Sequence, residues 1–123
     1  MRLLLVDDND EIAETISFYC GTKKDIDCHV IKNGHEGLES IRNEKFDLIL
    51  LDIAMPEFSG LDVIKSLKQD RSIESMNIVI FTVSSDQKIF NEIRNSGIKE
   101  VFKKPCSLND LIELVEKYRP IGE

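Results

Sequence analysis

The sequence contains no tryptophan, only three cysteines and no excess of positive charge. The cysteines, Cys20, Cys28 and Cys106, are odd in number and none forms a CxxC pair. This pattern argues against a disulfide framework and against a zinc site, and a reduced, cytoplasmic compartment is the simplest interpretation. The formal net charge of −7 argues against non-specific binding to nucleic acid, because the phosphates would repel the protein.

The sequence also lacks any apolar run that approaches the length of a membrane span, so no membrane association is expected. The opening MRLLLV is too short for the core of a signal peptide, and there is no internal repeat or low-complexity segment. What remains is ordinary for a globular protein, with 41% hydrophobic and 32% charged residues in a chain of 123. We therefore expect one domain over residues 1–123.

Five short aliphatic runs alternate with segments of helical length. Strands are expected over residues 2–7, 26–32, 47–52, 77–82 and 100–104. Most are nearly continuous leucine, isoleucine and valine, which is typical of parallel strands covered on both faces, whereas the second alternates and is expected at an edge. Strict β–α alternation with short connections predicts an α/β fold. We expect a single doubly wound, five-stranded parallel sheet of strand order 2-1-3-4-5, with helices on both faces.

Apolar stripes mark the helices that would pack on this sheet. The first helix is expected to bury Ile12, Ile16, Tyr19 and Cys20, and the last one Leu108, Leu111, Val115 and Tyr118. Phe18 lies off the first stripe and is expected to be exposed. Ser107 and Asp110 form a weak capping box ahead of the last helix. Gly60 is expected to open the third helix and Gly97 to close the fourth.

Polar residues stand where the predicted strands end. The first strand ends in Asp7 and Asp8, the third in Asp52, the fourth in Thr82 and the fifth in Lys104. In this class of fold, ligands bind outside the carboxyl ends of the strands, at the point where the strand order reverses. The sequence therefore predicts that three acids converge on one crevice, with a hydroxyl and an ammonium facing them.

Such a group of acids suggests phosphoryl chemistry. Three carboxylates a few ångströms apart repel one another, and one would stay protonated unless a cation joins them. Mg²⁺ is the usual hard divalent ion in cells, and it prefers carboxylates, water and a phosphate oxygen. Lys104 and Thr82 could hold other oxygens of a transferring phosphoryl group, and Asp52, central on its strand, is the best candidate nucleophile. Each residue alone has an ordinary role as a turn or cap, but together they fall at one end of the sheet.

Four ordered motifs make the whole chain resemble the receiver domain of a two-component response regulator. They are LLLVDDND, LILLDIAMPEFSGLDVIKSLK, IVIFTVSS and VFKKPCS. The resemblance implies a flavodoxin-like fold and a signalling switch that catalyses its own phosphorylation and dephosphorylation, rather than an enzyme. It implies that Asp52 receives a phosphoryl group from the phosphohistidine of a sensor histidine kinase or a histidine phosphotransfer protein. The effect would reach a downstream protein target or an output domain of the same protein.

The resemblance also assigns roles at the site. Mg²⁺ would be bound directly by Asp8 and by Asp52, more loosely or through water by Asp7, and by the backbone carbonyl of Ala54. Thr82 would bind the phosphoryl group and move on activation. Lys104 would pair with the phosphoryl group, and a cis Lys104–Pro105 bond would aim it.

The chain departs from the family pattern at two positions. Val101 stands where the family usually carries tyrosine or phenylalanine, and Phe102 is expected to face the other side of the sheet. Val83 stands where alanine or glycine is common. Because neither Ala54 nor Ser84 is long enough to position an attacking water, slow self-dephosphorylation is expected.

Two other classes of protein remain as alternatives. A flavin-mononucleotide electron carrier shares this sheet order, but its phosphate loop would here be the acidic DDND. A magnesium-dependent phosphatase with an aspartate nucleophile would need a second acid at position 54. His29 and His35 are expected to be solvated surface residues. Because no output segment follows Tyr118, the chain is either a free-standing receiver or part of a longer protein.

Overall fold

The computed structural model describes residues 1–70, 73–82, 87–104 and 107–120. Its elements are β1 (Arg2–Val6), α1 (Asp10–Gly21), β2 (Asp27–Ile31), α2 (Gly34–Asn43), β3 (Leu48–Asp52), α3 (Gly60–Gln69), a 3₁₀ turn η1 (Ile73–Ser75), β4 (Ile78–Thr82), α4 (Gln87–Arg94), β5 (Glu100–Lys103) and α5 (Leu108–Lys117). Each expected strand is present and is one or two residues shorter than the sequence pattern suggested. None of the helices in these ranges combines the length and apolarity that a membrane span requires.

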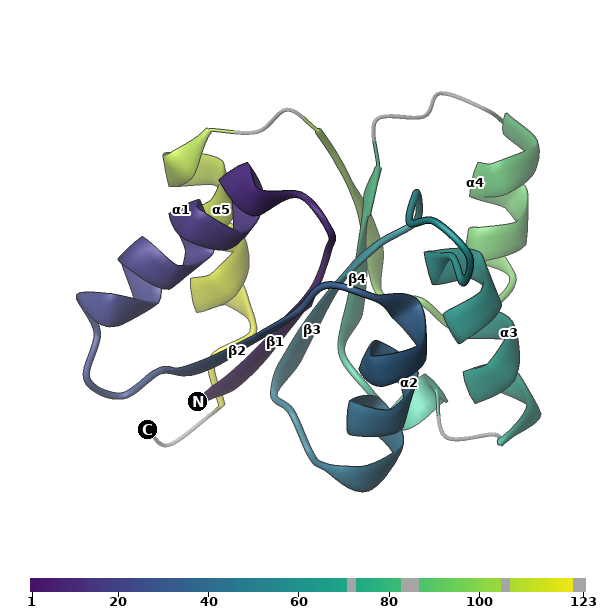
Figure 1. Cartoon of the computed structure of the whole chain (residues 1–123), viewed down its shortest axis with the longest axis horizontal. Helices are drawn as coiled ribbons and strands as arrows, with labels where there is room; N and C mark the ends of the chain where they lie inside the picture. Colours follow the sequence, from purple (N-terminus) through teal and green to yellow (C-terminus); the bar gives the residue numbers. More distant parts are fainter. Residues whose placement is uncertain (71–72, 83–86, 105–106, 121–123) are drawn as a thin grey trace.

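The five strands form one parallel sheet in the order β2-β1-β3-β4-β5, as predicted. Helices α1 and α5 cover one face, and α2, α3 and α4 cover the other (Figure 1). The two central strands β3 and β4 are buried along their whole length, whereas β2 lies at an edge and is partly exposed. This explains why the central runs are continuously aliphatic and why the sequence of β2 alternates.

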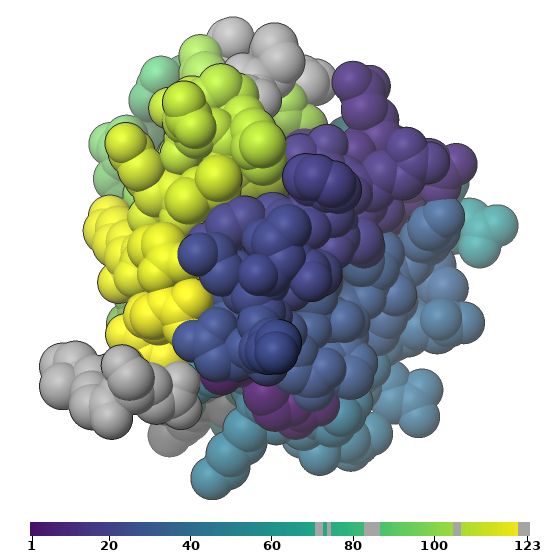
Figure 2. Space-filling view, turned by 90° about the vertical axis from the view of Figure 1, so that its left-hand side faces the viewer, coloured from purple at the N-terminus to yellow at the C-terminus, as the bar shows by residue number. Residues whose placement is uncertain are grey.

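Alternation along the strands divides the core into two clusters. On β1, Leu4 and Val6 point toward α2 and α3, whereas Leu3 and Leu5 point toward α1 and α5. Figure 2 shows α1 and α5 side by side on the second of these faces. The Tyr19 hydroxyl on α1 donates a hydrogen bond of 2.5 Å to Glu116 Oε1 on α5, which ties these two helices together.

The helix predictions hold in outline, with several corrections. Ile12 and Tyr118 are only partly buried, and Gly97 lies three residues beyond the end of α4 instead of closing it. Leu108 was expected in the buried stripe of α5, but it is 43% exposed. It is the first residue of that helix, where neighbours lie on only one side along the axis, so the buried stripe begins one turn later with Leu111, Leu114 and Val115. Phe18 is 70% exposed, as expected.

Side-chain caps set where several helices begin. The capping box of Ser107 and Asp110 is present at the start of α5. A second box, Ser59 with Asp62, starts α3, and the sequence analysis did not anticipate it. Gly60 opens α3, and a Cβ there would lie 2.3 Å from the carbonyl oxygen of Asp52. Only glycine permits this close approach, which brings the start of α3 directly against the end of β3.

Candidate functional site

Four polar side chains meet at the carboxyl edge of the sheet. Asp7 follows β1, Asp52 ends β3, Thr82 ends β4, and Lys104 comes directly after β5. Asp7, Asp52 and Thr82 are 0%, 5% and 2% exposed, although all three are polar. The backbone N–H of Lys104 donates to the carbonyl oxygen of Thr82 at 2.8 Å, which fixes the lysine beside the end of β4. The structure thus brings together the residues that sequence reasoning placed at one edge.

Three carboxylates form the centre of the site. Asp7, Asp8 and Asp52 each offer an oxygen, and these oxygens lie within 4.8 Å of one another. We call these three residues the acid cluster. Asp7 and Asp52 are buried and Asp8 is exposed, so the cluster opens to solvent on the side of Asp8. This spacing is compatible with oxygen ligands that share one small cation.

Lys104 supplies the positive charge that faces the acid cluster. Its Nζ donates to Asp7 Oδ2 at 2.6 Å and lies 3.6 Å from Asp52 Oδ1. The lysine therefore pairs mainly with Asp7, although the sequence analysis had placed it opposite a phosphoryl group on Asp52. The other oxygen of Asp7, Oδ1, accepts the backbone N–H of Asn9 at 2.9 Å. Both oxygens of Asp7 are thus occupied by protein donors, which fits the looser metal contact that the resemblance implies for this residue.

One ammonium does not balance the acid cluster, and the pKa of Asp52 reflects this. Burial, and after it the nearby charge of Asp7, raise the pKa of Asp52 to about 6. The Lys104 ammonium and the backbone N–H of Ala54 act in the opposite direction. The Ala54 N–H donates to Asp52 Oδ1 at 3.2 Å. The direction of this pKa shift agrees with the expectation that one acid of the cluster tends to keep its proton unless a cation joins it.

Local sequence signals explain how the first loop is built. Asn9 is the N-cap of α1, and its Oδ1 accepts the backbone N–H groups of Glu11 and Ile12. Its own N–H holds Asp7, as described above. The sequence analysis overlooked Asn9, although an asparagine between an acidic pair and an amphipathic run is a recognisable cap signal.

A valine, Val101, stands where the family usually carries an aromatic ring, and a pocket lies beside it. Val101 on β5 packs against the cluster under α2, α3 and α4. A surface pocket of about 310 Å³ lies beside it, lined also by Phe90, Ile93 and Ile98. Phe102 points to the other face, as predicted, and its ring meets Phe81 edge-on with centroids 5.5 Å apart.

Several expectations concern residues outside the described ranges. They are the cis bond between Lys104 and Pro105, the bulk of Val83 and the position of Ser84 beside the acceptor. The expectation for His35 is incomplete. This side chain is exposed, as predicted, but it also stacks on the Phe58 ring, a contact between residues far apart in sequence that no local pattern signals.

Known proteins resemble this chain in both sequence and fold. The family model of the response regulator receiver domain matches residues 3–116. The chain is 32% identical over 124 residues to the hybrid signal transduction histidine kinase G of Dictyostelium discoideum, and the match covers 98% of this chain. It is 36% identical over 87 residues to the polar-differentiation response regulator DivK of Brucella anthropi, with 71% of each chain covered. The receiver domain of the Francisella response regulator 1452 has a TM-score of 0.81 and 26% identity, and the match covers 95% of this chain and 94% of that one.

The chain spans only 4% of the length of the Dictyostelium kinase. The family model covers nearly the whole chain, and the sheet order and helix arrangement agree with the solved receiver structures. The chain therefore belongs to the response regulator receiver domain family of two-component signalling.

Proposed function

We propose that this chain is a phosphoacceptor that takes a phosphoryl group from a phosphohistidine onto Asp52. The observation that carries the proposal is the meeting of the acid cluster with Lys104 at the carboxyl edge of the sheet. Asp52 lies at the centre of this group, at the end of a strand that is buried along its length. A buried ionised acid costs stability, so its presence at this position supports a functional role.

The donor set fits a hard divalent cation such as Mg²⁺. The acid cluster supplies three carboxylates against one ammonium, and burial together with the charge of Asp7 raises the pKa of Asp52, which a bound cation would offset. Asp8, Asp52 and the Ala54 backbone carbonyl would hold the ion, with Asp7 contributing loosely or through water. When bound, Mg²⁺ would neutralise the carboxylates and polarise an oxygen of the incoming phosphoryl group.

The chain's own residues would carry out the transfer. Ionised Asp52 attacks phosphorus in line, its new O–P bond forms as the N–P bond of the phosphohistidine breaks, and the imidazole leaves with the electron pair and takes up a proton. The Ala54 N–H, held on Asp52 Oδ1, fixes the plane of the attacking carboxylate. Because the pKa of Asp52 is about 6, the attacking form dominates only above that pH unless a cation lowers the pKa.

Lys104 and Thr82 would stabilise the transferred group. The Lys104 ammonium, 2.6 Å from Asp7 and 3.6 Å from Asp52, needs only a small side-chain movement to reach an oxygen of a phosphoryl group on Asp52. Thr82, at the end of the neighbouring strand β4, would place its hydroxyl on another oxygen. Both contacts form only when the phosphoryl group is present, so they can couple phosphorylation to a change of shape.

The partners follow from the same chemistry. The donor would be a sensor histidine kinase or a histidine phosphotransfer protein, and the receiver of the signal would be a downstream protein or an output domain of the same protein. Family membership argues against the flavin and phosphatase alternatives. In addition, neither alternative explains a lysine whose ammonium faces a cluster of three acids. The cytoplasmic location stays a prediction.

A small phosphoryl donor tests this function without a kinase. Incubation with acetyl phosphate and Mg²⁺ should add one phosphoryl mass to the intact protein, and EDTA should prevent the addition. The Asp52→Asn variant should stay unmodified. Full labelling of Asp52→Asn would show that another residue is the acceptor.

A further inference from the structure

The loop from β3 to α3, residues 53–59, carries Ala54 and is anchored to α2 by a stacked pair of rings. The Phe58 ring on this loop lies on the imidazole of His35, with centroids 4.1 Å apart and planes inclined by 26°. His35 is the second residue of α2, so the contact joins the acceptor loop to a helix that contributes nothing else to the site.

The loop needs such an anchor because its own backbone is strained. Glu57 has φ of 67°, in the left-handed region that residues with a Cβ rarely adopt. The next residue makes a tight turn, in which the Phe58 N–H donates to the carbonyl oxygen of Pro56 at 2.7 Å. Strained conformations persist only where surrounding contacts enforce them.

Backbone contacts show how closely the loop is held against α2. A Cβ at Gly34, the first residue of α2, would lie 2.1 Å from the carbonyl oxygen of Phe58. The loop backbone and the start of the helix therefore touch directly, and Phe58 contributes both the backbone and the ring to this contact. Movement of Phe58 away from α2 would release the loop at its most strained point.

Backbone hydrogen bonds connect the anchored loop to the proposed acceptor, Asp52, and to the start of α3. Ala54, four residues before Phe58, donates its N–H to Asp52 Oδ1, and the Gly60 N–H donates to the carbonyl oxygen of Ile53 at 3.0 Å. Met55 is buried in the core, so the loop is fixed at its middle as well as at Phe58. The position of the Ala54 backbone, both its N–H and its carbonyl, thus depends on a loop that is closed by the contact with α2.

We propose that His35 and Phe58 are positioning residues for phosphorylation, because their stack holds the Ala54 backbone where it binds the acceptor and the metal. This inference rests on the proposed function, since it assigns the loop a part in Mg²⁺ binding. Neither side chain touches the reacting atoms. Their removal should weaken Mg²⁺ binding by about tenfold, at the low end of the range that loss of an indirect support produces.

The test measures Mg²⁺ affinity by amide NMR titration, together with the Mg²⁺ dependence of acetyl phosphate uptake. Phe58→Ala should raise the Mg²⁺ concentration at half-saturation in both measurements, whereas the rate at saturating Mg²⁺ should stay within about twofold of wild type. Phe18→Ala is the matched control, because it removes the same ring from an exposed site on α1. It should leave both curves unchanged.

His35 variants keep the test decisive if Phe58→Ala fails to fold. His35 is exposed, so its replacement leaves the core intact. His35→Ala should weaken Mg²⁺ binding, and His35→Phe, which keeps a ring on Phe58, should restore it. His29→Ala serves as the control on the edge strand.

The outcomes separate this inference from the proposed function. If wild type binds Mg²⁺ and takes up phosphoryl, but Phe58→Ala and His35→Ala bind Mg²⁺ equally well, the inference is wrong and the function stands. Equal weakening in Phe18→Ala would also overturn it, because the effect would then be general. If wild type itself neither binds Mg²⁺ nor takes up phosphoryl, the proposed function fails and the inference falls with it.

Discussion

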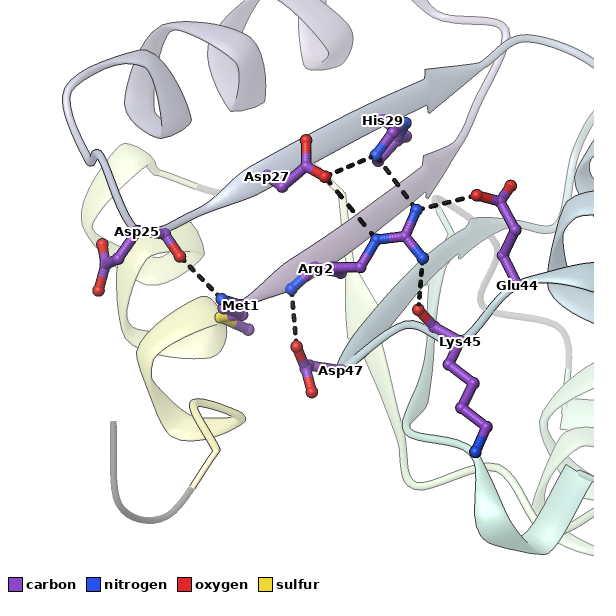
Figure 3. A network of polar contacts seen from close by, with 8 residues as sticks. All are labelled: Met1, Arg2, Asp25, Asp27, His29, Glu44, Lys45 and Asp47. Carbon is purple, nitrogen blue, oxygen red and sulfur yellow. Dashed lines mark hydrogen bonds and ion pairs between the residues drawn. The ribbon is translucent and has the colours of Figure 1, made fainter.

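The balance of positive and negative groups differs between the two ends of the sheet. At the amino end, the Arg2 guanidinium donates to the carbonyl oxygen of Lys45 and to Glu44 Oε1, both at 2.9 Å, and lies 3.7 Å from Asp27 Oδ2 (Figure 3). The same Asp27 oxygen lies 3.1 Å from His29 Nε2. In this network the guanidinium is surrounded by acidic and polar partners, and the side chains remain partly exposed. At the carboxyl end, the acid cluster places three carboxylates beside one ammonium, and two of the acids are buried.

The difference separates a structural network from a functional site. Charges at the amino end satisfy one another, so that network is complete within the chain. The acid cluster is left short of positive charge, and the neighbouring loop holds Glu57 in a left-handed conformation. Locally unfavourable features that gather at one place are the expected signature of a site completed by a ligand.

The largest expected contrast comes from removing one charged side chain at each end. Asp8→Ala should slow phosphorylation from acetyl phosphate on the order of 100-fold, because it would remove a proposed direct ligand of Mg²⁺. Arg2→Ala should change that rate less than about twofold, because the network of Arg2 lies at the far end of the sheet. Initial rates of uptake, followed by intact mass at fixed Mg²⁺, provide the measurement. Similar losses of phosphorylation rate in both variants would show that the two ends of the sheet do not differ in function.

A second contrast concerns stability in the absence of metal. The folded state raises the pKa of Asp52 to about 6, so it binds this proton more tightly than the unfolded chain does. Ionisation of Asp52 therefore costs stability, and the cost is absent below the ordinary carboxyl pKa and fully present above about pH 6. Asp52→Asn should raise the free energy of unfolding by about 1–3 kcal/mol near pH 7.5 in EDTA.

Urea denaturation at two pH values checks this prediction. The advantage of Asp52→Asn should shrink as the pH falls from about 7.5 to about 4.5, because wild-type Asp52 then becomes protonated. Added Mg²⁺ should stabilise wild type and narrow the difference at the higher pH. An advantage that stays constant with pH would mean that the buried charge is not its cause.

A further prediction concerns the lifetime of the phosphorylated state at the carboxyl end of the sheet. Ala54 is exposed, lies two residues after Asp52, the proposed acceptor, and carries no group that could hold a water in line with the phosphorus. Ala54→Asn adds an amide that can position this water, so it should speed loss of the phosphoryl group by about tenfold. The decay of phosphorylated protein after removal of acetyl phosphate gives the rate. Equal decay in both proteins would show that position 54 does not govern water access.

The smallest expected effect belongs to the amino end. Arg2→Ala breaks partly exposed ion pairs, so it should lower the free energy of unfolding only slightly. Raising the salt concentration should reduce this loss further, because screening already weakens exposed pairs. Urea denaturation at low and high salt measures it. A large loss of stability would mean that this network stabilises the fold more than its exposure suggests.

Much of the fold could be predicted because hydrophobic runs and their ends are local signals. Each aliphatic run became a strand, and the acids that terminate the first and third runs fell at the carboxyl edge, as parallel topology requires. The edge position of β2 and the outward orientation of Phe18 followed from periodicity alone.

Features that depend on approach in space were not predictable from local pattern. The stack of His35 on Phe58 joins residues 23 positions apart, and only the packing of α2 beside the acceptor loop brings them together. The preference of Lys104 for Asp7 over Asp52 reflects a difference of 1 Å between its two ion-pair distances. Side-chain torsions set such differences, and strand-end position does not encode them.

Locating the phosphoryl group directly tests the central claim that the acid cluster serves Asp52. Protein treated with acetyl phosphate and Mg²⁺ would be reduced with borohydride, which converts an aspartyl phosphate to homoserine, and then mapped by peptide mass spectrometry. We expect homoserine at position 52 alone, and only in the sample that contained Mg²⁺. Homoserine at position 7 or 8, or equal conversion at position 52 without a divalent ion, would contradict it.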